Sequence, residues 1–338
     1  MNADHPGLIL MQSEMARQRR DALETLESSR AAAALIAERI RTLRRLVLYG
    51  IGGSHHVNRI AETLYLDEGI DTRAVVASDA LLSRPQEVSA VALLTSQSGR
   101  SGEICSLLRR PAGREERFGI TLEREGPLAQ SVRSSLVGVG GTEHAFAATR
   151  STVLCLTMHG AILEALGSSQ RATREVLGAA PFLPSDTDRV ASVLRGSEVI
   201  VFVGRHVMRG AAESEALSMM ELARMPTLAF EGGQFRHGPF EFLRPGIAVV
   251  LLRSAGPDAS GIAELAQTAT AAGCVTVILD SSGLEPVAAC ETYRLPAAAG
   301  LAAVLQTLLF LQEVNVNVAR YRIARGVGSP LRTSKVTL

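Results

Sequence analysis

Short apolar runs alternate with helical stretches along most of the chain. Residues 12–41 contain many Ala, Leu, Glu and Arg and few turn formers, which predicts one or two helices before the first strand. Apolar runs that end at glycine or at small polar residues then predict strands at 45–50, 72–77, 90–95, 117–122 and 135–140. Helical patterns lie between them at 57–66 and 101–110. Strands that alternate with helices predict an α/β fold, in which helices cover both faces of a parallel sheet.

The same order of elements occurs twice. The segment 198–213 repeats the strand, glycine turn and helix of 45–62, and 248–256 repeats 90–99. Gly50 and Gly204 are about 154 residues apart, and Ala90 and Ala248 about 158, so the two halves keep nearly the same register. We therefore expect two tandem copies of one α/β unit.

A polar stretch with several glycines and prolines separates the two copies. We expect the N-terminal helices and the first unit in residues 1–166, a linker in 167–188, and the second unit with a C-terminal tail in 189–338.

The composition narrows the class of protein. The 338 residues are 46% hydrophobic and 20% charged, as expected of a soluble globular chain. Apolar runs such as 153–163 are shorter than a membrane span, and the N-terminus does not have the pattern of a signal peptide, so we expect a cytoplasmic protein without membrane contact. A net charge of +1 and the absence of tryptophan make nucleic acid an improbable partner.

Two loops of the first half could hold a phosphate group. "GIGGSHH" (50–56) and "TSQSGRSGE" (95–103) each follow a strand and lead into a helix, where free N–H groups and the helix dipole favour an anion. Four side chains of the second loop would add hydrogen-bond donors, namely those of Ser96, Gln97, Ser98 and Ser101. The alternative is that both loops only connect strands to helices, as many glycine and serine loops do.

The sequence has no cofactor signature. The dinucleotide fingerprint G-x-G-x-x-G fails because His55 stands at the third glycine, and no G-x-x-x-x-G-K-[ST] motif is present. His55 and His56 are adjacent and therefore diverge, and no other histidine or cysteine supports them at ligand spacing. We expect neither a cofactor nor a metal.

Two residues of the second half are candidates for acid–base chemistry. Glu221 lies on a helix with a buried face, and His237 lies in the loop "FRHGPF", where glycine and proline constrain the backbone. The alternatives are a solvated helix glutamate and a surface histidine.

Five motifs in this order resemble the tandem sugar isomerase (SIS) domain proteins. They are "GIGGS", "TSQSGRSGE", "GTEHAFAATRS" (141–151), "GGQFRHGP" (232–239) and a "KVT" tail, and "MQSEMARQ" (11–18) is similar to the helical segment that precedes the family's first sheet. The family includes the isomerase half of glucosamine-6-phosphate synthase, sugar-phosphate deaminases and fructosamine-6-phosphate deglycases. The resemblance implies two SIS-type units, a sugar phosphate ligand and a homodimer.

The resemblance also implies roles for individual residues. The family's phosphate-binding positions are occupied by Gly53, Ser54, Ser96, Gln97, Ser98 and Ser101. Glu221 falls on the glutamate that moves a proton between the sugar C1 and C2 atoms. His237 falls on the ring-opening histidine, which in the family reaches in from the neighbouring subunit. Lys335 falls on the tail lysine that folds over the sugar.

Lys335 is also unusual by itself, because all 34 other basic residues are arginine. Arginine cannot lose its proton to form a Schiff base, so a single retained lysine is consistent with a need for an amine. The alternative is chance in an arginine-rich composition.

The sequence departs from the synthase at several positions. Ser214 and Ser218 replace a glutamate and a lysine on the helix of Glu221, and Ala148 replaces a serine that contacts the phosphate. The synthase's glutaminase domain is absent from these residues, so we expect this chain alone not to take ammonia from glutamine.

Three functions stay open at this point. The first is an isomerase or deaminase that acts on an amino-sugar or ketose 6-phosphate by proton transfer between C1 and C2. The second is a fructosamine-6-phosphate deglycase, which would use the same base and acid. The third is a noncatalytic regulator that binds a sugar phosphate.

Overall fold

The computed structural model of the chain describes residues 5–84 and 87–326. The described chain divides into two compact units: residues 10–178 form the first, and residues 179–326 form the second together with residues 5–9 at the start of the chain. The main boundary therefore lies between Gly178 and Ala179. This boundary falls inside the segment 167–188 expected as a linker, which carries α8 (Arg171–Gly178) and the start of α9 (Pro184–Leu194).

The first unit contains one parallel sheet. Its strands are β1 (Arg45–Gly50), β2 (Asp71–Val76), β3 (Ala90–Thr95), β4 (Glu115–Thr121) and β5 (Ser135–Val137). Their order across the sheet is β2-β1-β3-β4-β5, with all neighbours parallel. In the register, Leu48 lies beside Ala74 of β2 and Leu93 of β3.

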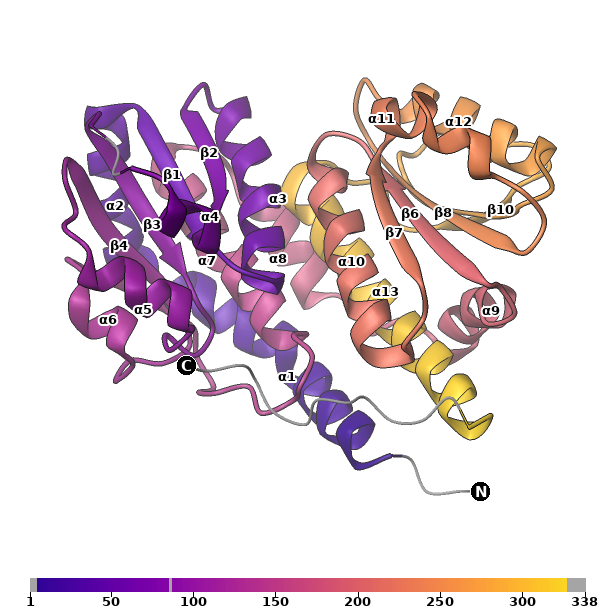
Figure 1. Cartoon of the computed structure of the whole chain (residues 1–338), viewed down its shortest axis with the longest axis horizontal. Helices are drawn as coiled ribbons and strands as arrows, with labels where there is room; N and C mark the ends of the chain where they lie inside the picture. Colours follow the sequence, from indigo (N-terminus) through magenta and orange to yellow (C-terminus); the bar gives the residue numbers. More distant parts are fainter. Residues whose placement is uncertain (1–4, 85–86, 327–338) are drawn as a thin grey trace. The chain divides into compact units, whose positions relative to one another are not determined.

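Helices cover both faces of this sheet. They are α1 (Pro6–Ser28), α2 (Arg30–Leu43), α3 (Gly53–Asp67), α4 (Ala77–Leu82), α5 (Gly102–Arg109), α6 (Pro127–Ser131) and α7 (Arg150–Leu166). Helices α2, α3 and α7 pack together on one face, and α4, α5 and α6 lie on the other (Figure 1). Because strand side chains alternate, Val47 and Tyr49 point to the face of α4 and α5, where they pack with Leu94 and Leu107.

The second unit repeats this arrangement. Its strands are β6 (Val199–Gly204), β7 (Thr227–Glu231), β8 (Ile247–Ser254), β9 (Val275–Ser281) and β10 (Glu291–Arg294). Their order is β10-β9-β8-β6-β7, again with all neighbours parallel. Since β6 corresponds to β1 and β8 to β3, the two units have the same topology. The expected α/β fold with two tandem units is confirmed.

The second sheet also lies between two helix layers. Its helices are α10 (Val207–Ala223), α11 (Gly232–Arg236), the short 3₁₀ helix η1 (Pro239–Phe242), α12 (Ala259–Ala271) and α13 (Gly300–Ala324). Helices α9, α10 and α13 form one layer, and α11 and α12 lie on the other face (Figure 1). Phe235 of α11 and Leu265 of α12 pack on Val201 and Val249 of the sheet.

Among the described residues, α13 alone is long and apolar enough to span a membrane by length and composition. However, 89% of its apolar window is buried within the protein. Its burial is that of a core helix.

A buried ion cluster fixes α1 to the start of α7 in the first unit. The guanidinium of Arg150 is fully buried and lies 2.7 Å from Glu14 and 3.3 Å from Asp21. It also donates to the carbonyl oxygens of Val139 (3.0 Å) and Gly141 (2.6 Å). The cluster joins the motif "MQSEMARQ" to the motif "GTEHAFAATRS", so these two stretches act together as structural elements.

Candidate active site

The two predicted phosphate loops lie at one edge of the first sheet. Strands β1 and β3 are neighbours, whereas the chain leaves β1 to form β2 on the other side, so their carboxyl ends flank a topological switch point. Ligands of open α/β sheets bind in the crevice at such a point. The loop after β1 and the loop after β3 are therefore brought to the same edge of the sheet.

Glycine shapes the first loop. Gly52 has φ 55° and ψ −132°, a conformation that favours glycine, and it precedes α3 without a side chain that could cap the helix. A Cβ atom on Gly50 would lie 2.7 Å from the side-chain amide nitrogen of Asn58, so glycine is required for α3 to approach the strand. Gly53 and Ser54 consequently form the uncapped first turn of α3, where backbone N–H groups attract an anion.

The second loop places three predicted side chains in one turn. Ser96 is buried and its hydroxyl oxygen lies 2.9 Å from that of Ser101, the residue that precedes α5. Gln97 is 9% exposed, and its backbone carbonyl oxygen accepts hydrogen bonds from the Leu122 backbone amide and the Thr121 hydroxyl. These bonds fix the backbone of the loop and leave its side chains available.

The side-chain amide nitrogen of Gln97 is buried and has no hydrogen-bond partner among the described residues. Buried donors of this kind are rare in folded proteins because they lose their hydrogen bonds to water. An anionic oxygen in the crevice would satisfy this donor together with the hydroxyls of Ser96 and Ser101. Ser98 has a more local role, since its hydroxyl oxygen accepts the Arg100 amide at 3.2 Å.

Two further residues extend the crevice. Ala148 lies 3.7 Å from the position of a Cβ atom on Gly53, so the alanine that replaces the synthase's serine does lie beside the first loop. Asn58 accepts a hydrogen bond from Thr95 at 2.8 Å and links α3 to the end of β3. The sequence analysis did not single out Asn58. Its signal was a polar residue on the helix face that otherwise carries Val57, Ile60 and Ala61.

The corresponding strand ends of the second unit carry arginines with carboxylate partners. His206 has φ 51° and ψ −129°, nearly the conformation of Gly52 at the same place. The preceding residue, Arg205, lies 3.4 Å from Glu231 and 3.6 Å from Asp258. At the end of β8, buried Arg253 pairs with Asp280 at 3.1 Å and donates to the Ala259 carbonyl oxygen. Guanidinium groups with their own carboxylates therefore stand where the first unit has hydroxyls and an amide.

The acid–base candidates both belong to the second unit. Glu221 is half-buried on the last turn of α10, two residues before the helix ends at Ala223. His237 is exposed directly after α11, and the next residue, Gly238, has φ 116°. Lys335 lies outside the described residues. Among those residues there is no group of three or more His, Cys, Asp or Glu side chains that could hold a metal ion.

Helix α10 carries a second glutamate in a very different environment. Glu215 is 2% exposed, and one of its carboxyl oxygens accepts a hydrogen bond from the side chain of Asn315 on α13 at 2.8 Å. Burial raises the pKa of Glu215 to about 8, and the Asn315 bond offsets this only in part. Glu215 is thus held as a neutral acid near pH 7.

Replacing Glu215 with glutamine should change how stability depends on pH. The pKa of Glu215 is higher in the folded protein than its unfolded value of about 4.5. The contribution of this carboxyl group to the free energy of unfolding is therefore fully present below pH 4.5. This stabilisation is lost as the pH rises to about 8, by on the order of 4 kcal/mol. Glu215→Gln keeps the acceptor for Asn315 but does not titrate. Urea unfolding followed by circular dichroism should therefore give it a higher midpoint than wild type at pH 8 and a smaller difference at pH 5.

Glu213→Gln is the matched control for this prediction, since Glu213 lies on the same helix but pairs with Arg209 at its surface. It should keep the wild-type pH dependence. An unchanged pH dependence in Glu215→Gln would contradict the assignment.

The comparisons with known proteins agree with this geometry. No protein-family model matches the chain. Glutamine–fructose-6-phosphate aminotransferase (isomerizing) from Aeropyrum pernix is 27% identical over 324 residues, which cover 88% of this chain and 51% of the relative. The chain thus spans about half the length of the curated relatives it matches first.

Solved structures show the same fold. The C-terminal domain of glucosamine-fructose-6-phosphate aminotransferase from Francisella tularensis has a TM-score of 0.84 and 16% identity, covering 95% of this chain and 97% of that one. Tagatose-6-phosphate ketose/aldose isomerase from Escherichia coli has a TM-score of 0.79 and 18% identity, covering 97% and 96%. The resemblance inferred from the motifs is confirmed. By fold the chain matches tandem SIS-type units, and by sequence it is similar to the isomerase domain of glutamine–fructose-6-phosphate aminotransferase.

Proposed function

We propose that the protein is a phosphosugar isomerase or deaminase that transfers a proton between C1 and C2 of an amino-sugar or ketose 6-phosphate. The observation that carries this proposal is the buried, unpartnered amide of Gln97 beside the paired hydroxyls of Ser96 and Ser101. The Gln97 amide and the one hydroxyl proton that the Ser96–Ser101 pair leaves free are donors at a topological switch point, and they suit the oxygens of a phosphate group.

The chemistry assigns one role to each candidate. The phosphate group does not react, but its binding energy holds C1 and C2 in place. Glu221 removes the proton from one carbon and returns it to the other, and His237 protonates the ring oxygen to open the sugar. His237 is exposed, which is compatible with a role in the active site of a second subunit in a homodimer. Lys335 supplies an amine that can form a Schiff base with the open-chain carbonyl.

A deglycase that acts on a fructosamine 6-phosphate is the second candidate. Ser214 and Ser218 are buried on α10, where the resembled synthase has a glutamate and a lysine. A deglycase would use the same base and acid but release an amine from C1. The absence of these two charged groups favours a reaction that needs only Glu221 and His237.

Exchange in D2O separates these functions. The full chain is incubated with glucosamine, fructose and fructosamine 6-phosphates, and NMR follows the C1 and C2 protons and the products. Deuterium incorporation or product formation with one of these sugars supports an enzyme, and the released product distinguishes an isomerase, a deaminase and a deglycase. Saturable binding without exchange of any sugar would contradict catalysis and indicate a noncatalytic regulator.

Replacing Gln97 with methionine should weaken substrate binding through the phosphate group. A hydrogen bond to a charged group contributes roughly 1.5–3 kcal/mol, so KM should rise about 10- to 150-fold for the phosphorylated sugar. Gln130→Met is a matched control, because Gln130 is an exposed glutamine of the same unit. An unchanged KM in Gln97→Met would remove the amide from the proposed phosphate site.

A further inference from the structure

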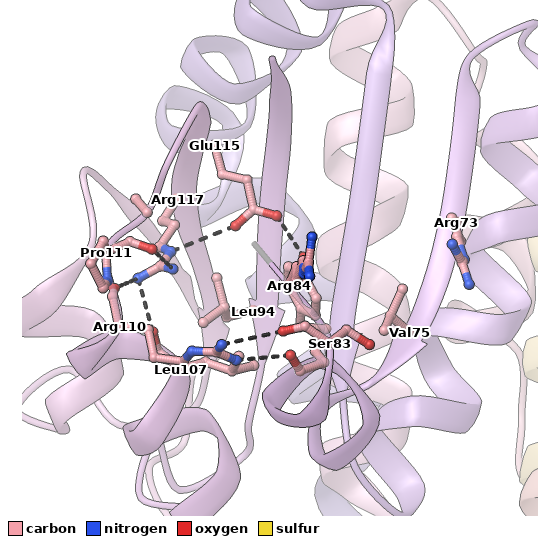
Figure 2. Close-up of a pocket in the computed structure, with 13 residues that line it drawn as sticks. Arg73, Val75, Ser83, Arg84, Leu94, Leu107, Arg110, Pro111, Glu115 and Arg117 are labelled. Atoms are coloured by element: carbon pink, nitrogen blue, oxygen red, sulfur yellow. Dashed lines mark hydrogen bonds and ion pairs between the residues drawn. The ribbon is translucent and has the colours of Figure 1, made fainter. Parts of the chain in front are cut away.

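A second concave site lies on the first unit, on the sheet face that carries α4 and α5. Its cavity volume is about 80 Å³, which is room for roughly five water molecules or one phosphate group. Figure 2 shows that Val75 and Leu94 line it from β2 and β3, and Leu107 lines it from α5. Four arginines surround this apolar floor, from β2, the segment after α4, the end of α5, and β4. They are Arg73, Arg84, Arg110 and Arg117.

Backbone carbonyl groups hold two of these arginines in place. Arg110 donates to the carbonyl oxygens of Ala80 (2.9 Å), Leu81 (3.0 Å) and Ser83 (3.2 Å). Arg117 donates to those of Leu107 (2.9 Å), Arg110 (2.9 Å) and Pro111 (3.3 Å). Carbonyl groups orient a guanidinium without neutralising it, so both arginines keep their positive charge. Dashed lines in Figure 2 mark the bonds of Arg110 and Arg117 to the residues drawn there, which do not include Leu81.

The pocket has one carboxylate among its described lining residues, that of Glu115. Glu115 accepts a hydrogen bond from the Tyr49 hydroxyl at 2.5 Å and lies 3.8 Å from Arg117. Burial, together with this carboxylate, raises the pKa of Tyr49, so the tyrosine stays a neutral donor. Arg117 therefore balances Glu115, and the other three arginines are left without a carboxylate partner.

Arg73 and Arg84 are the groups free to bind a ligand. Both side chains are exposed, and neither makes an ion pair or a side-chain hydrogen bond with another described residue. With Arg110 they place three uncompensated positive charges around a small apolar floor. A planar guanidinium presents paired N–H donors that match the oxygens of a phosphate group.

This pocket is separate from the proposed substrate site. Ser101 precedes α5 and faces the crevice at the carboxyl ends of the strands, whereas Leu107 and Arg110 lie at the opposite end of the helix. The eight residues of α5 correspond to a length of about 12 Å. One phosphate group cannot occupy both places.

We propose that this pocket, defined by Arg73, Arg84, Arg110 and Arg117, is a second anion site that binds the phosphate group of a small ligand. The substrate crevice uses neutral hydroxyls and an amide, whereas this pocket uses guanidinium groups. It therefore selects by charge, and its ligand is a phosphate ester or inorganic phosphate. The proposal does not depend on the reaction proposed above, because none of its residues belongs to that site.

Titration of the isotope-labelled full chain with inorganic phosphate tests the proposal. Amide shifts in a two-dimensional NMR spectrum, at constant ionic strength, report each site separately. Saturable shifts are expected at residues 80–84 and 107–117 in wild type. In the double variant Arg73→Gln, Arg84→Gln the apparent affinity at these residues should fall by about 2- to 30-fold, since it loses two exposed charge contacts.

A charge-matched variant controls for a general effect of net charge. Arg109 and Arg124 are exposed arginines of the same unit outside the pocket, so Arg109→Gln, Arg124→Gln lowers the charge equally and should keep the wild-type affinity. Absence of saturable shifts around the pocket in wild type would overturn the proposal. An equal loss of affinity in both double variants would also overturn it, since binding would then follow net charge alone.

Discussion

Replacing Glu221 with glutamine is expected to slow exchange of the C1 and C2 protons by about 10²- to 10⁴-fold, the usual contribution of a positioned general base. Glutamine has nearly the same shape as glutamate but cannot accept a proton, so substrate binding should change much less than turnover. Exchange in D2O followed by NMR measures the first quantity, and KM or ligand titration measures the second.

Glu213→Gln is the control on the same helix, and it should exchange protons at the wild-type rate. The proposed contribution of His237 to the active site of the neighbouring subunit allows a second test. Mixing Glu221→Gln with His237→Asn should restore part of the activity if the two residues of one active site come from different chains. Wild-type exchange in Glu221→Gln would rule out this glutamate as the base, and no recovery in the mixture would rule out the shared site.

Replacing Arg150 with methionine should lower the free energy of unfolding of the first unit by about 3–5 kcal/mol, which is typical when one partner of a buried ion cluster is removed. The substitution removes the one fully buried cation beside Glu14 and Asp21, which then keep only the more exposed Arg17 and Arg20. It also removes the donor to the carbonyl oxygens of Val139 and Gly141. Urea unfolding followed by circular dichroism measures the change.

Arg17 provides the comparison within the same cluster. It contacts Glu14 at 3.2 Å and Asp21 at 3.5 Å, but 33% of its side chain is exposed. Arg17→Met should therefore cost at most about 1 kcal/mol. In the Arg150→Met background, Glu14→Gln with Asp21→Asn should recover part of the loss, because neither buried side chain then carries a charge. Equal losses in the free energy of unfolding for Arg17→Met and Arg150→Met would show that burial of the arginine does not determine how much it stabilises the unit.

Much of the fold could be predicted because several apolar runs stop sharply at glycine or at small polar residues, which mark the strand ends. The runs 45–50 and 90–95 match β1 and β3 at both ends, since a glycine or a small polar loop follows each apolar run directly. Less regular elements gave weaker signals. Strand β10 (Glu291–Arg294) contains little apolar sequence and owes its conformation to pairing with β9. Helix α4 has only six residues, too few to show a helical period.

The candidate site was predicted in part. The hydroxyls of Ser96 and Ser101 were expected to share one turn, and the structure shows them in contact. Burial of the Gln97 amide could not be predicted, because it depends on how the loop packs on β4. The arginine pocket is also invisible in the sequence, since Arg73 and Arg117 come from strands at different places in the sheet and only the topology brings them to one cavity.

The arginine loop of the second unit has an evolutionary consequence. Arg205 lies between Glu231 and Asp258, and all three side chains are partly exposed. Ion pairs at such positions contribute at most about 1 kcal/mol, as for Arg17. Loss of one carboxylate should therefore be tolerated, and it would leave Arg205 with less compensating charge and better able to attract an anion. After duplication, this half of the chain would stay within a few single mutations of a charged ligand site.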